Sequence, residues 1–212
     1  MNSDIKKILN SLKKPCHKIT YKQNYEYWED ADPDIFKTSC YIFDEAWVRD
    51  DSGRDFVFQI INDEGLCLPK EIAKIQLYYH LDNSSMNLVI TNDPVTEYVK
   101  PEDIKNINGV MYFESSYNLP DWETLKDIHT NEFELIKSIV AENKEEFDWE
   151  IYDDFIENVL GHDNHRSFVG GHLNLTSELI KRPSDDYQFI MQIETECNGG
   201  DTVYIFQDKN NT

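Results

Sequence analysis

The chain has 212 residues, of which 41 are acidic and 20 are basic, so its formal net charge is −21. This length fits one domain with a sizeable core, and an aromatic content of 13% argues against a disordered chain. The negative charge argues against nucleic acid and anionic membranes as partners, because both attract clustered lysine and arginine.

The N-terminal part of the chain predicts a short helix followed by a strand. Apolar residues recur at helical spacing over residues 3–14, and Pro15 ends the pattern. Residues 17–28 alternate loosely, as a strand does, and residues 26–34 are typical of an acidic loop. No apolar run is long enough for a signal peptide or a membrane span, so we expect a cytoplasmic protein.

Several later segments have the β-branched and aromatic composition of strands. They are residues 40–49, 55–61, 75–81, 86–90, 110–114, 187–194 and 202–206. Turn-forming residues separate the first two of these segments and also the last two, which predicts two hairpins.

Between these strand segments the apolar spacing becomes helical. Asp121 is predicted to cap a helix that begins at Trp122, and a second helix follows Thr130. Asp148 is predicted to cap a third helix that ends at Gly161. Its core-facing side chains are expected to be Tyr152, Phe155, Ile156 and Val159. No linker divides the chain, so the sequence predicts a single α+β domain over residues 1–212.

Two stretches of the chain are similar to each other. Residues 55–60 and 189–193 both read as an apolar strand that contains Gln and Ile, and each is followed by a loop and an aromatic-rich strand. This similarity predicts an internal duplication.

Four segments, in this order, resemble the YwqG-like family, bacterial proteins of unknown function. They are Phe58-Gln59-Ile60 with Leu68-Pro69 and Ile75 to Tyr79; Leu119-Pro120-Asp121-Trp122; His165 with Gly170-Gly171; and Phe189 to Ile193 with Gly200-Asp201 and Tyr204-Ile205-Phe206. The resemblance covers about residues 40–206. It implies a compact fold of antiparallel sheets with packed helices, built from two intertwined repeats, and no known reaction. Some relatives look like immunity proteins encoded beside bacterial toxins.

The sequence departs from the family pattern at two turns. The family usually has a Gly-Gly-x-Pro turn before its first Gln-containing strand, whereas residues 38–43 contain neither glycine nor proline. The family's second glycine pair is usually followed by Pro and Trp, whereas residues 172–175 are His, Leu, Asn and Leu. Any binding surface that relatives share at these turns is therefore in doubt here.

Motifs for catalysis and for cofactor binding are missing from the sequence. It has no nucleophile elbow and no phosphate-binding glycine loop, and no cofactor or catalytic residue is predicted. The best metal candidate is the segment from His162 to His165, but its spacing does not match a known metal motif, so no metal is predicted. This favours a non-enzymatic role without excluding an enzyme.

Charge gives the leading functional hypothesis. Residues 142–157 contain eight acids and one lysine, with aromatic residues among them. Aromatic anchors among charges of one sign are typical of a protein surface that binds a basic partner. The predicted contacts are Trp149, Tyr152, Glu145, Glu146, Asp153 and Asp154, with Tyr27 and Trp28 in the second acidic segment. The hypothesis is a protein-binding module, such as an immunity protein that neutralises a cationic toxin. The competing interpretation is a solvated helix face.

The alternative hypothesis is a small-ligand or divalent-cation site between the two repeats, in a binding protein or an enzyme. Its predicted residues are Gln59, Tyr79, His165, Gln192 and Asp201. For the two glutamines the competing interpretation is structural, because a buried Gln must form hydrogen bonds within the core.

Overall fold

The computed structural model describes residues 3–23, 39–41, 55–62, 65–80, 85–92, 109–142, 146–162, 164–175, 183–184, 186–194 and 202–209. The chain forms two compact units. Unit 1 comprises Met1–Lys18, Ser115–Thr195 and Gly200–Thr212, and unit 2 comprises Ile19–Glu114 and Glu196–Gly199. Helices and antiparallel strands together confirm the α+β class. That the two units form one domain stays a prediction.

Unit 1 contains the described helices and one set of strands. The helices are α1 (Ser3–Leu12), α3 (Trp122–Ile128), α4 (Thr130–Glu142) and α5 (Trp149–Leu160). The strands are β7 (Phe168–Gly170), β8 (Tyr187–Glu194) and β9 (Thr202–Asp208). The first part of β1 (Lys14–Gln23) pairs with β7, so the described strands follow the antiparallel order β1-β7-β8-β9.

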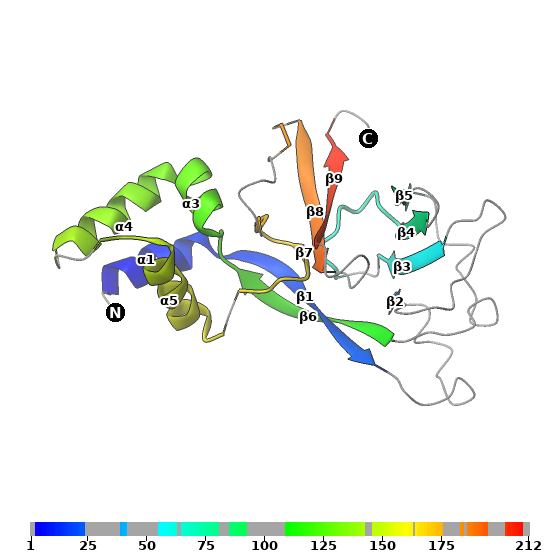
Figure 1. Cartoon of the computed structure of the whole chain (residues 1–212), viewed down its shortest axis with the longest axis horizontal. Coiled ribbons are helices and arrows are strands. Elements are labelled where there is room, and N and C mark those ends of the chain that lie inside the picture. The colour runs from blue at the N-terminus through cyan, green and yellow to red at the C-terminus, as the bar shows by residue number, and fades with distance from the viewer. Residues whose placement is uncertain are drawn as a thin grey trace. The chain divides into compact units, whose positions relative to one another are not determined.

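The helices of unit 1 lie together (Figure 1) and share one hydrophobic core. Helices α1, α4 and α5 each contribute a stripe of side chains at helical spacing, as the sequence predicts, and α3 contributes Leu125. The buried members are Ile5, Leu9, Leu12, Leu119, Leu125, Phe133, Ile136, Val140, Tyr152, Ile156 and Val159. Among the helices that the structure describes, none is long and apolar enough to cross a membrane.

The predicted helix ends are confirmed. The Asp121 carboxylate accepts a hydrogen bond from the Thr124 amide at 2.6 Å and begins α3. The Asp148 carboxylate accepts one from the Ile151 amide at 3.0 Å and begins α5. Gly161 ends α5 with a φ of 75°, a left-handed conformation that glycine adopts without strain.

The two capping aspartates are expected to differ in their contribution to stability. The second carboxylate oxygen of Asp121 also accepts a hydrogen bond from the Leu175 amide, which joins α3 to the segment after β7. We expect Asp121→Ala to lower the free energy of unfolding by about 2 kcal/mol, against about 1 kcal/mol for Asp148→Ala, where only the cap is lost. Urea denaturation measures both values, and equal losses would contradict a role for Asp121 beyond capping.

Unit 2 contains the second set of antiparallel strands. They are β2 (Ser39–Tyr41), β3 (Asp55–Ile61), β4 (Lys74–His80), β5 (Ser85–Thr91) and the first part of β6 (Gly109–Asn118). Their hydrogen-bonded order is β5-β4-β3-β2-β6. The predicted pairing of the first hairpin is confirmed by β2 and β3, whereas residues 42–49, which the prediction also placed in a strand, lie outside the described residues. β1 and β6 each run from one unit into the other.

The two similar stretches of sequence have matching irregularities. The β3–β4 register shifts between Phe56 and Phe58, and the β8–β9 register shifts between Phe189 and Met191. These positions correspond when the two stretches are aligned, and a buried glutamine follows next in each strand. The duplication stays a prediction, which this correspondence supports.

Candidate functional site

Helix α5 presents acidic side chains along one side, and a large aromatic ring in its first turn, to solvent. Trp149 is 56% exposed, which is unusual for a tryptophan. Within the helix the exposed acids Glu150, Asp153, Asp154 and Glu157 recur three or four positions apart, so they share one side. Glu146 precedes the cap of the helix, and Trp149 is its first residue. We call this surface the α5 acidic face: Glu146, Trp149, Glu150, Asp153, Asp154 and Glu157. Residues 146–162 contain no lysine or arginine that would neutralise it within the segment.

The opposite side of α5 and its two ends hold the α5 acidic face in place. Tyr152, Ile156 and Val159 bury this side in the helical core. Asp148 caps the first turn, and the Lys13 ammonium donates to the Val159 carbonyl near the last turn, at 3.3 Å. A cation at a helix C-terminus and a carboxylate at its N-terminus both stabilise the helix dipole. The face is therefore presented by a packed and capped helix.

The structure corrects one predicted contact. Tyr152 is buried, and its hydroxyl donates a hydrogen bond to the Pro120 carbonyl at 2.8 Å. Its ring lies 5.9 Å from that of Trp122. Burial, followed by the charges of Asp121 and Asp153, raises the pKa of Tyr152 well above its usual value. Tyr152 is a core residue that joins α5 to α3, so it does not contact a partner.

The remaining predicted contacts divide into described and undescribed residues. Trp149, Glu146, Asp153 and Asp154 are exposed on the α5 acidic face. Glu145, Tyr27 and Trp28 lie outside the described residues, and so does Asp201 of the alternative site.

Gln192 of the alternative site forms hydrogen bonds inside the core. It is fully buried; its carbonyl oxygen accepts from the Asn174 amide at 3.2 Å, and its amide donates to the Arg166 carbonyl at 3.0 Å. It therefore braces the segments on both sides of β7.

Gln59 is also fully buried, in unit 2, where its carbonyl oxygen accepts from the Gln76 amide at 2.8 Å. The geometry fits the structural interpretation of both glutamines. Tyr79 lies in β4 of unit 2, whereas His165 and Gln192 belong to unit 1. A ligand site shared by these residues stays a prediction.

His165 contacts Ser116, a partner that the sequence did not indicate. Its Nε2 lies 2.7 Å from the Ser116 hydroxyl, and its ring stacks on that of His162 with 4.7 Å between centroids. Burial, His162 and Lys18, in this order, lower the pKa of His165 from 6.5 to about 4. A histidine with this pKa is neutral and a weak base at pH 7, which disfavours a catalytic serine–histidine pair.

Strand geometry explains why serines contact two different histidines. Neighbouring residues of β6 point to opposite faces, so Ser116 meets His165 whereas Ser115 lies 3.2 Å from Nε2 of His17. The sequence shows that Ser115 and Ser116 are adjacent, but nothing in it indicates which histidine each of them contacts.

Within the described ranges, no three His, Cys, Asp or Glu side chains are placed to hold a metal ion. Asp163, the middle residue of the metal candidate, lies outside these ranges.

No protein-family model and no curated protein matches the sequence. The YwqG-like resemblance therefore stays a prediction that rests on the order of its four motifs.

Proposed function

We propose that this chain is a cytoplasmic, non-enzymatic protein-binding module whose α5 acidic face docks a basic partner protein. The observation that carries the proposal is the exposure of Trp149 in the first turn of α5, a capped and packed helix whose other exposed side chains include four carboxylates. Tryptophan is among the residues that most often dominate binding energy at interfaces. The surrounding carboxylates would steer a cationic protein towards it.

The class of partner follows from the charge. A basic protein that itself binds nucleic acid, such as a cationic bacterial toxin, presents a surface complementary to the α5 acidic face. This agrees with the immunity role that the YwqG-like resemblance implies. The net charge of −21 means that the whole chain attracts a basic protein electrostatically.

The test compares two triple charge reversals in a pull-down from a lysate of the source cells. One variant is Glu146→Lys, Asp153→Lys and Asp154→Lys, on the α5 acidic face. The matched control is Glu71→Lys, Asp127→Lys and Glu134→Lys, exposed positions outside the acidic segment 142–157 that change the net charge equally. We expect a salt-sensitive basic partner to lose at least about tenfold in affinity only with the first variant, and similarly with Trp149→Ala.

Two outcomes would contradict the proposal. If both triple variants weaken binding equally, the net charge rather than the α5 acidic face attracts the partner. If the native chain retains no basic protein at low salt, the proposed function is wrong.

A further inference from the structure

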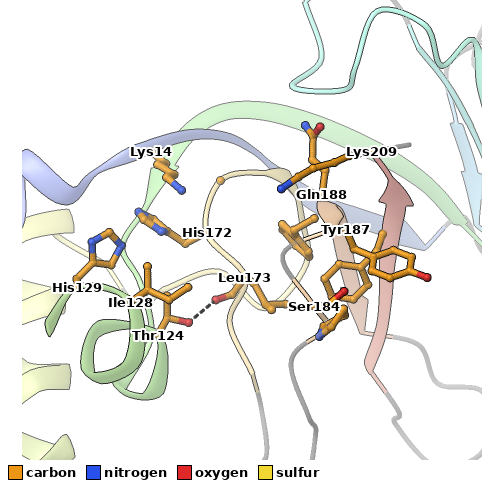
Figure 2. A pocket seen from close by; sticks show the side chains of 14 residues that line it. Lys14, Thr124, Ile128, His129, His172, Leu173, Ser184, Tyr187, Gln188 and Lys209 are labelled. Carbon is orange, nitrogen blue, oxygen red and sulfur yellow. Dashed lines mark hydrogen bonds between the residues drawn. The ribbon is translucent and has the colours of Figure 1, made fainter. Parts of the chain in front are cut away.

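Unit 1 contains a cavity of about 410 Å³ that is separate from the α5 acidic face (Figure 2). It lies between α3, the turn that follows β7 and the ends of β8 and β9. Its volume falls in the range of small-molecule binding sites. None of the residues predicted from the sequence as ligand contacts lines it.

Two basic side chains line the cavity, although the chain as a whole is acidic. Lys14 and Lys209 line it, and among its described lining residues none is acidic, although the chain has 41 acids and 20 bases. Figure 2 shows the two ammonium groups on opposite sides of the cavity, both directed towards its middle. Two lysines that face one space are suited to bind a phosphate or a carboxylate.

A histidine beside Lys14 is held in a fixed orientation. The Nε2 of His172 lies 2.7 Å from the Leu12 carbonyl, so this nitrogen donates the hydrogen bond. The backbone amide of His172 donates to the Asn118 side chain at 2.9 Å. The ring of His129 meets that of His172 edge-on, with 5.4 Å between centroids. This side of the cavity therefore carries nitrogen-bearing groups that are positioned in advance.

The other side of the cavity is aromatic. Tyr187 and Phe189 alternate along β8 and so share one face of the strand. Phe206 of β9 pairs with Phe189, and their ring centroids are 5.7 Å apart. Rings in this arrangement can pack against a flat apolar group.

From this combination we propose that the cavity binds a small organic phosphate monoester with an aromatic body, because two ammonium groups match the nearly double negative charge of a phosphate monoester better than the single charge of a carboxylate. Lys14 and Lys209 contact the phosphate, His172 lies beside it, and the aromatic side receives the ring. This site goes beyond the proposed protein-binding function, because it uses none of the residues of the α5 acidic face. Neither proposal depends on the other.

Isothermal titration calorimetry of the full chain at low salt tests the site with phenyl phosphate, inorganic phosphate and phenol as probes. We expect phenyl phosphate to bind most tightly, inorganic phosphate more weakly and phenol not measurably. The double variant Lys14→Gln/Lys209→Gln should weaken phenyl phosphate binding at least about tenfold. The control Lys6→Gln/Lys137→Gln removes two exposed lysines outside the cavity and should leave binding unchanged.

A third variant tests the aromatic side. Tyr187 is 46% exposed, so Tyr187→Ala should fold, and we expect it to weaken phenyl phosphate several-fold while inorganic phosphate binds as before. Absence of phenyl phosphate binding at millimolar concentration would overturn the proposal. Equal losses in the two lysine double variants, or phenol binding as tightly as phenyl phosphate, would overturn it as well.

Discussion

Replacing Gly171 by alanine is expected to lower the free energy of unfolding by about 3 kcal/mol. Gly171 has a φ of 76°, which strains any residue with a Cβ. A Cβ here would also lie 2.3 Å from the side-chain oxygen of Asn118. That oxygen cannot move freely, because Asn118 is buried and forms two hydrogen bonds with the backbone of His172. The substitution therefore adds a steric clash to the backbone strain.

Gly161→Ala is the matched control for this prediction. Gly161 has a φ of 75°, close to that of Gly171, but nothing lies within 4 Å of the added Cβ. We expect it to destabilise the protein by about 1 kcal/mol, the effect of strain alone. Urea denaturation of both variants measures the difference. If the two losses are equal, the contact with Asn118 contributes nothing and the explanation fails.

The second large effect is a dependence of stability on pH that His165 produces. Its pKa is about 4 in the folded protein and 6.5 in an unfolded chain. Between these values the unfolded state binds more protons, so stability falls as the pH drops from 6.5 to 4. The full difference corresponds to about 3 kcal/mol, and solvent screening reduces the expected loss to about 2 kcal/mol. Well above pH 6.5 His165 is neutral in both the folded and the unfolded state, so the stability lost on acidification is fully retained there.

His165→Gln separates this effect from the protonation of carboxylates. Glutamine keeps a polar group opposite Ser116 but does not titrate. We therefore expect the difference in unfolding free energy between the native chain and the variant to shrink by about 2 kcal/mol from pH 7 to pH 4. NMR titration of the His165 ring gives the pKa directly. Parallel stability curves for the two proteins, or a ring pKa near 6.5, would refute the prediction.

The glutamines show how far local sequence reasoning extends. Their position in apolar strands predicted burial, and burial predicted hydrogen bonds, both of which the structure shows for Gln59 and Gln192. The identity of their partners was not predictable. Gln192 bonds to Asn174 and Arg166, which lie in segments that fold back beside β8.

For Tyr152, the helical spacing and the local charge of the sequence give opposite predictions. Helical spacing placed it on the core side of α5, whereas its acidic neighbours suggested a binding surface. The spacing was the better guide, because burial on a helix follows from which side the residue occupies, whereas charge density along the chain ignores sides. The same spacing places Trp149 on the stripe of Tyr152 and Ile156, and its 56% exposure follows from its position as the first residue of α5.

The sequence by itself determined the helices, most strand segments and the helix caps, because these depend on spacing and on contacts between residues three or four positions apart. It also determined the charge that motivates the proposed function. Only the tertiary structure decided which side chains far apart in the chain meet. The pair of Ser116 and His165 and the cavity between Lys14 and Lys209 are formed by strand order and chain reversal. These long-range contacts leave no periodic pattern in the sequence, so no local rule predicts them.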